Sequence, residues 1–295
     1  MGRILDAMVY RVKQFWFLLW TATKTYLNGP YYSCLELNRQ YGLLWKVRKL
    51  SPDDSDIPSS LEGKVCVITG GTRGIGLEVV KVLLKKGCYV ITGSSANEQE
   101  IKKRHREILN ELGDDTKGVL EIWPLDLSSM DSVKRFALKI KLSSLKINYL
   151  ICNGGVMFVP FALTQDDFEM HFAINYLSHC LLTWLLLPNL CAAAKSSREK
   201  SRIIYVTSGL HRATGKIRFK DLQSTKFFSV YHAYAQSKLA EIMFAFKLHD
   251  YLGEINKSND VNVLVLHPGV CRTQLMGNFS WFNTVQSLPL FRVSK

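Results

Sequence analysis

The chain has 295 residues, which is enough for one large α/β domain. Hydrophobic residues make up 47% of it, which excludes general disorder. Lys and Arg number 38 against 25 Asp and Glu, and residues 1–50 contribute +6 of the formal charge of +13. This uneven distribution indicates a basic targeting or membrane-surface segment at the N-terminus, and it argues against a domain that binds nucleic acid.

The first 24 residues show the pattern of an amphipathic helix, with Trp and Phe on its apolar face and Lys and Arg beside it. The uncharged stretch between Lys13 and Lys24 is ten residues long, whereas a spanning helix needs about 20. We therefore predict that residues 1–50 form a basic leader whose helix lies on a membrane surface. A helix packed on its own domain and a cleaved signal peptide are the alternatives.

Residues 51–63 are rich in Pro, Ser and Asp and predict a linker. Short apolar runs then alternate with helical patterns. Strands are expected at 64–69, 88–92, 119–125, 148–152, 202–207 and 261–266, and helices at 75–86, 97–112, 129–142, 165–193 and 233–252. The alternation predicts the α/β class, with one doubly wound parallel sheet of the Rossmann type over residues 64–295.

The cysteines do not change this predicted organisation. Seven cysteines, an odd number, are scattered without a CxxC pair or a Cys/His cluster. This spacing predicts reduced thiols and no metal site.

A glycine-rich loop joins the first predicted strand to the first predicted helix. In this position Gly70 allows a tight exit from the strand, Gly74 lets the backbone approach a pyrophosphate, and Gly76 permits close packing of helix on sheet. The phosphates of a dinucleotide would lie at the N-terminus of the helix, where N–H groups are free. The residues expected to bind the cofactor here are Gly70, Thr72, Arg73, Gly74, Ile75 and Gly76. A glycine-rich turn without a ligand is the alternative.

The end of the second predicted strand bears on which dinucleotide is bound. An NAD site uses an acid there to accept a hydrogen bond from the ribose 2′-hydroxyl. Here the segment is Thr92-Gly93-Ser94-Ser95, with no acid, while Arg73 is placed to meet a 2′-phosphate. We therefore expect NADP(H), with Ser94 and Arg73 near that phosphate. NAD(H) stays open, as does a solvated Arg73.

Tyr234 and Lys238 lie four residues apart near the start of the last predicted helix and so share one face. A nearby ammonium lowers the pKa of a phenol, which lets Tyr234 exchange a proton with an alcohol oxygen while hydride moves at its carbon. Ser208 follows the fifth predicted strand, where its hydroxyl could hold the substrate oxygen. Taken singly, each of these signals is weak. Most tyrosine–lysine pairs with this spacing are exposed residues on a helix.

Taken in order along the chain, the motifs resemble those of the short-chain dehydrogenase/reductase family over about residues 62–275. The resemblance implies that Ser208, Tyr234 and Lys238 are catalytic and that Asn175 supports a proton-relay water. It also implies that Lys238 holds the nicotinamide ribose. Further cofactor contacts are implied at Asp126, Leu127, Asn153, Gly155, Tyr234, Pro268 and Thr273.

Two segments, Asp221-Leu-Gln223 and Ala233–Ala240, are similar to the retinol-dehydrogenase-like and polyprenol-acting (X-chromosomal dehydrogenase/reductase-like) branch. This similarity implies an oxidoreductase that interconverts a lipophilic alcohol and its aldehyde or ketone. The substrate could be retinoid-, steroid- or polyprenol-like. It also implies association with the endoplasmic reticulum, with the domain facing the cytosol, and leaves a homodimer open.

The sequence departs from the family pattern in two places. The turn Cys152-Asn153-Gly154-Gly155 places a cysteine and a second glycine where the family has Asn and Ala, so we expect a looser turn. In addition, only the 22 residues from Gln274 to Lys295 follow Thr273, so we expect the domain to lack the family's last strand. The alternative function is therefore a membrane-associated protein that binds nucleotide or a partner, with impaired catalysis.

Overall fold

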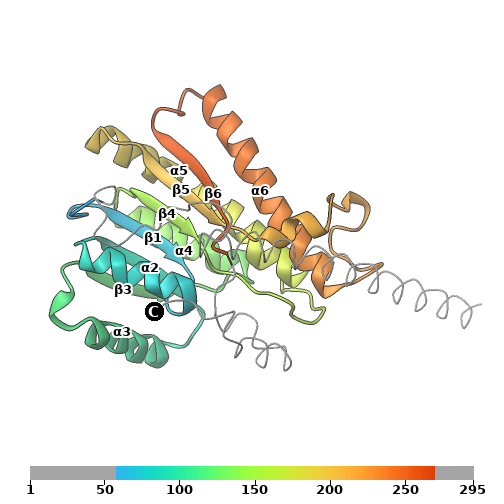
Figure 1. Cartoon of the computed structure of the whole chain (residues 1–295), viewed down its shortest axis with the longest axis horizontal. Coiled ribbons are helices and arrows are strands. Elements are labelled where there is room, and N and C mark those ends of the chain that lie inside the picture. The colour runs from blue at the N-terminus through green and yellow to red at the C-terminus, as the bar shows by residue number, and fades with distance from the viewer. Residues whose placement is uncertain (1–57, 270–295) are drawn as a thin grey trace, which may run out of the picture.

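The computed structural model describes residues 58–269. The predicted leader, its helix over residues 1–24 and most of the linker lie outside the described residues, as does everything after Gly269. The described part contains a six-stranded, entirely parallel sheet in the order β3-β2-β1-β4-β5-β6 (Figure 1). The predicted doubly wound parallel sheet is confirmed.

The strands fall close to the predicted positions. Their bounds are β1 Val65–Thr69, β2 Tyr89–Ser94, β3 Val119–Pro124, β4 Tyr149–Cys152, β5 Ser201–Val206 and β6 Val261–Leu266. The helices are α2 Gly74–Lys85, α3 Glu98–Leu112, α4 Met130–Leu142, α5 Ser178–Ser197 and α6 Val230–Glu254. Short turns connect them, namely the π-helical turn Phe172–Leu177 and the 3₁₀ turns Gly113–Asp115, Gly209–Ala213 and Phe219–Asp221.

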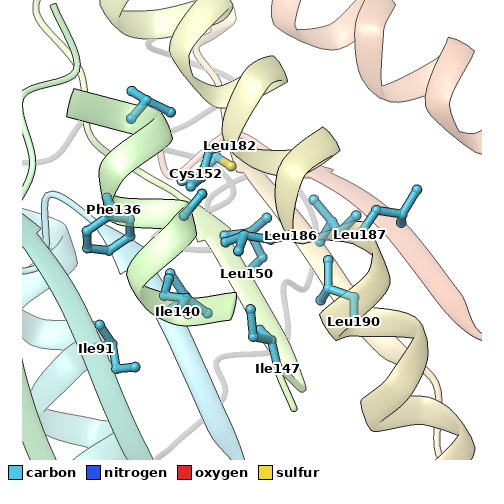
Figure 2. Packing of buried hydrophobic residues seen from close by; sticks show 14 of the residues in the cluster. Ile91, Phe136, Ile140, Ile147, Leu150, Cys152, Leu182, Leu186, Leu187 and Leu190 are labelled. Carbon is cyan, nitrogen blue, oxygen red and sulfur yellow. The ribbon is translucent and has the colours of Figure 1, made fainter. Parts of the chain in front are cut away.

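Two apolar cores cover the two faces of the sheet, as expected for strands that are buried on both sides. On one face, α2 and α3 pack on the strands through residues such as Val80 and Ile108. On the other face, α4, α5 and α6 form the larger core, in which Phe136 and Ile140 of α4 meet Leu150 of β4 (Figure 2). The helices thus enclose the strands and leave the strand ends to form a site.

Helix α5 and its preceding π-helical turn, Phe172–Ser197, are together long and apolar enough to cross a membrane. Half of the most apolar window is buried, however, and Leu182, Leu186 and Leu190 pack into the core of the sheet (Figure 2). Burial of an apolar stripe against a sheet accounts for this composition in a core helix.

The helix predicted over 165–193 begins and ends later than the sequence pattern indicates. The Thr164 hydroxyl accepts hydrogen bonds from the backbone N–H groups of Asp166 and Phe168, both at 3.3 Å. Asp167 has a φ of 61°, which a helix cannot contain. At the other end, Arg198 adopts the left-handed conformation that stops α5. Local hydrogen bonding by Thr164 therefore replaces the first predicted helical turn.

All six strands end at the same edge of the sheet, and the strand order reverses between β1 and β4. In open parallel sheets a ligand binds at this reversal, beyond the carboxyl ends of the strands. Among the described residues β6 is an outer strand, and the segment that would hold a further strand lies beyond residue 269. The predicted lack of a last strand stays a prediction.

Candidate active site

The glycine loop between β1 and α2 has the close backbone contacts that its glycines require. Gly70 has a φ of 67°, and a Cβ there would lie 2.8 Å from Gly154 Cα. A Cβ on Gly76 would overlap the Gly70 carbonyl oxygen and lie 2.5 Å from Asn153 Nδ2. Because these neighbours are backbone or a hydrogen-bonded amide, they cannot move aside cheaply. Both positions therefore need glycine.

The N-terminus of α2 opens at this loop without a side chain to cap it. Arg73 is the N-cap residue, with extended backbone and no capping hydrogen bond, and the first turn carries no acid. The first N–H groups of a helix have no partner within the helix, and the helix dipole favours an anion beside them. The uncapped turn and the glycine cradle together fit the pyrophosphate of a dinucleotide.

Two arginines lie at the loop, although the sequence pattern indicated only one. Arg73 is exposed, and its side chain makes no hydrogen bond or ion pair within residues 58–269. Arg104, on α3, donates from Nε to the Thr72 carbonyl oxygen at 2.9 Å and pairs with Glu107. The sequence did not predict Arg104 at this loop, because the place of Arg104 depends on how α3 packs beside the loop. Ser94 ends β2 without an acid, as predicted.

The predicted adenine contacts, Asp126 and Leu127, follow β3. Asp126 is exposed, and one of its carboxylate oxygens accepts hydrogen bonds from the N–H and the hydroxyl of Ser128, at 2.8 and 2.7 Å. Leu127 is partly buried and packs toward the Asn153–Gly155 turn. A Cβ on Gly154 would lie 2.8 Å from Leu127 Cδ1, so the second glycine of that turn makes room for this leucine.

The expected looseness of the turn after β4 is offset by Thr69, at the end of β1. Its hydroxyl accepts hydrogen bonds from the N–H groups of Asn153 and Gly154, at 3.0 and 2.8 Å. It lies 2.9 Å from Nε2 of the buried His179, to which it can donate its own hydrogen. Cys152 packs in the larger core, where its thiol lies 3.9 Å from the Thr183 hydroxyl, and burial raises the pKa of the thiol far above the ordinary range.

Asn175 lies in the π-helical turn before α5, a feature that often marks functional sites. Its Oδ1 accepts from the Val156 N–H at 2.8 Å, and its Nδ2 donates to Val156 O at 3.0 Å and to the Ser237 hydroxyl at 2.9 Å. A Cβ on Gly155 would lie 2.9 Å from Asn175 Oδ1 and 4.0 Å from Lys238 Nζ. The structure thus brings Gly155, Asn175 and Lys238 together.

The predicted catalytic tyrosine and lysine are both buried on α6. The Tyr234 ring lies edge-on to the rings of Phe158 and His171, at 5.6 and 6.3 Å between centroids. Lys238 Nζ donates to the Val206 carbonyl oxygen at 2.9 Å and pairs with Glu241 at 3.0 Å. Burial is the largest single influence on Lys238 and lowers its pKa, but the charge and hydrogen bond of Glu241 together with the nearby Tyr234 and Cys152 outweigh it, so that the net shift is upward.

Ser208 follows β5 and caps the 3₁₀ turn Gly209–Ala213, which packs against α6. Its hydroxyl accepts from the Leu210 N–H at 3.3 Å. Pro268 follows β6 at the same edge of the sheet, whereas Thr273 lies outside the described residues. Sequence reasoning missed the buried partners of the predicted residues, His179 and Glu241, because neither belongs to a recognisable motif.

Aromatic side chains gather around Tyr234. Phe158 contacts Tyr231 at 4.7 Å between ring centroids, and Phe161 contacts Phe228 at 5.2 Å. Phe161 is 44% exposed, so this second aromatic pair reaches the protein surface. Tyr234 therefore has aromatic neighbours, and one of them, His171, pairs with the buried Glu169.

The parallel sheet and the uncapped glycine loop beside its strand-order reversal are those of the dinucleotide-binding α/β class. The family model of the short chain dehydrogenases matches residues 64–281. The chain belongs to this family, and the predicted resemblance is confirmed.

Individual relatives support the predicted branch. The chain is 37% identical to the polyprenol dehydrogenase of Danio rerio over 225 residues, which are 76% of this chain and 66% of that protein. It is 38% identical to retinol dehydrogenase 14 of Mus musculus over 224 residues, 74% and 64% of the two chains. The chain thus spans slightly less than two thirds of the length of these curated relatives.

Solved structures share the fold. An uncharacterised protein from Mycobacterium paratuberculosis aligns with a TM-score of 0.62 and 30% identity, over 78% of this chain and 76% of that one. The RhlG–NADP complex of Pseudomonas aeruginosa aligns with a TM-score of 0.59 and 23% identity, over 80% and 86%. These alignments agree with the parallel sheet described above.

Proposed function

We propose that the protein is an NADP(H)-dependent oxidoreductase that interconverts a lipophilic alcohol and its aldehyde or ketone. The observation that carries the proposal is the buried pair of Tyr234 and Lys238 beside Asn175, at the edge of the sheet where the glycine loop opens. The polyprenol and retinol dehydrogenases among the relatives, and the aromatic cluster around Tyr234, support a lipophilic substrate.

The dinucleotide would be held by the uncapped N-terminus of α2 and by Lys238, and when bound it supplies or accepts the hydride. Tyr234 donates a proton to the carbonyl oxygen in reduction and takes one from the hydroxyl in oxidation. Ser208 holds the same oxygen by a hydrogen bond. Lys238 keeps a positive charge near the phenol and so lowers the cost of forming the phenolate. Asn175 fixes the backbone next to this group through Val156.

The preference for NADP(H) over NAD(H) rests on Arg73 and on the end of β2. A guanidinium matches a phosphate well, and β2 offers no acid that would repel one. Arg73→Ala should raise the KM for NADPH about tenfold or more and leave the KM for NADH nearly unchanged. Equal effects on both dinucleotides would contradict the assignment.

The direct test of the activity is NADPH oxidation by purified protein with a panel of lipid aldehydes that includes retinal and a polyprenal. Tyr234→Phe should reduce kcat at least a hundredfold. Tyr251→Phe removes a phenol near the other end of α6, distant in sequence from the site, and should leave kcat unchanged. Binding of NADPH without turnover of any carbonyl would instead favour the impaired-catalysis alternative.

We also propose that residues 1–24 place the protein on a membrane surface, most simply that of the endoplasmic reticulum with the domain in the cytosol. The polyprenol and retinol dehydrogenase relatives support this placement, since their substrates are lipids. Liposome flotation of the full chain and of a form without residues 1–24 tests it. Equal recovery of both forms in the soluble fraction would contradict it.

A homodimer is supported by the outer faces of α5 and α6, where Trp184, Met243 and Phe246 are between 47% and 68% exposed. Light scattering after size-exclusion chromatography measures the mass in solution, which should be twice that of one chain. A monomer at all concentrations would contradict this proposal.

A further inference from the structure

The ammonium group of Lys238 donates hydrogen bonds to two acceptors. Lys238 is 5% exposed, and its Nζ donates to Val206 O at 2.9 Å and to Glu241 Oε2 at 3.0 Å. On α6, Tyr234 comes four residues before Lys238 and Glu241 comes three residues after it. The positive charge of Lys238 therefore acts on both the phenol of Tyr234 and the carboxylate of Glu241.

Glu241 is 1% exposed, and its second oxygen, Oε1, has no hydrogen-bond partner in the described part of the chain. His179 Nδ1 lies 3.9 Å from this oxygen, which is too far for a hydrogen bond. The Thr69 hydroxyl, which accepts two N–H groups, donates to His179 Nε2. The proton on Nδ1 then goes to Asn175 O, at 3.0 Å. Glu241 thus faces a neutral imidazole.

The elements packed around Glu241 supply one cation. The titratable groups that face it are Lys238 on α6, His179 and Cys180 on α5, Cys152 on β4 and Tyr205 on β5. Burial lowers the pKa of His179 to about 4, so this ring is neutral at pH 7. Burial also raises the pKa of Glu241 to about 7, although the charge of Lys238 lowers it.

Burying a carboxylate that has one unpaired oxygen and a single cationic partner costs free energy. Ionisable groups of this kind are concentrated at functional sites. We propose that Glu241 is a positioning residue that sets the acidity of Tyr234 through Lys238. Ionised Glu241 offsets the lysine charge and keeps the ammonium turned inward. Protonated Glu241 leaves the full charge for the phenol and for the ribose of the dinucleotide. The proposal rests on the proposed roles of Tyr234 and Lys238 and adds the group that tunes them.

The test follows the ionisation of Tyr234 directly, without substrate or cofactor. Protein labelled with ¹³C at the tyrosine Cζ is titrated by NMR, and Tyr234→Phe identifies the resonance. In Glu241→Gln the negative charge is absent, so Tyr234 should ionise about one pH unit lower than in the wild type. Glu241→Asp keeps a carboxylate and should restore part of the difference. An unchanged or higher midpoint in Glu241→Gln would overturn the proposal.

Glu121→Gln is the matched control. Glu121 is a partly buried carboxylate on β3, the outer strand at the other edge of the sheet from β6, and it accepts hydrogen bonds from Tyr89 and Trp123. This variant should leave the Tyr234 midpoint unchanged; an equal shift would mark a general charge effect and overturn the specific role. The pH profile of carbonyl reduction should move in parallel with the NMR midpoint in Glu241→Gln. If the wild type reduces no carbonyl, the proposed function fails, while the NMR comparison still decides the role of Glu241.

Discussion

Thr69 allows the sharpest test of how the site is held together. Its hydroxyl is fully buried and makes three hydrogen bonds, to the N–H groups of Asn153 and Gly154 and to His179 Nε2. Thr69→Val keeps the shape and the strand preference of the side chain but leaves these three groups without a partner. At about 1–3 kcal/mol for each unsatisfied buried group, and less for the partly buried Asn153 N–H, the loss should be about 3–5 kcal/mol.

Urea unfolding followed by circular dichroism measures this loss. With a slope of about 2–3 kcal/mol per M for a domain of this size, the midpoint should fall by about 1–2 M. Thr183→Val is the matched control, because the Thr183 hydroxyl is equally buried but has one strong bond, to the Tyr205 hydroxyl at 2.7 Å. That variant should lose about 1–2 kcal/mol. If Thr69→Val lost no more than Thr183→Val, the proposed tie between β1 and β4 would be refuted.

Two further predictions concern the cofactor loop and acid stability. Gly76→Ala should weaken NADPH binding at least tenfold in a fluorescence titration, because its Cβ would press on the Gly70 carbonyl, whereas Gly253→Ala, with nothing within 4 Å, should bind NADPH normally. Burial lowers the pKa of His179 to about 4, so the folded state takes up its proton less readily than the unfolded chain. Stability should therefore fall by about 3 kcal/mol as the pH drops from 6.5 to 4. His179→Gln should show a flatter dependence in urea unfolding at a series of pH values, and an unchanged slope would contradict the buried neutral ring.

Much of the fold follows from local pattern, because apolar runs and helical periodicity are properties of neighbouring residues. The six strands and the glycine loop were predictable for this reason, and so was the tyrosine–lysine pair, whose spacing is that of one helix face. The start of α5 was not, since Thr164 competes for backbone hydrogen bonds in a way that periodicity does not report.

The supporting groups of the site could not be predicted, because they meet only through the topology. Thr69 and His179 are 110 residues apart in the chain, and their contact depends on α5 packing across the end of β1. Gly154 was expected to weaken its turn, yet the neighbouring Leu127 occupies the space that a Cβ would need. Glu241 belongs to no motif, and its significance comes from its burial against Lys238.

The central claim is that Tyr234 protonates a lipophilic carbonyl while hydride reaches its carbon. The most direct measurement uses NADPH carrying deuterium at the transferable position, with retinal or a polyprenal as substrate and mass spectrometry of the alcohol product. One deuterium should appear at the carbinol carbon with the wild type, and its rate of appearance should fall at least a hundredfold with Tyr234→Phe. Equal deuterium transfer by the two proteins would contradict the account.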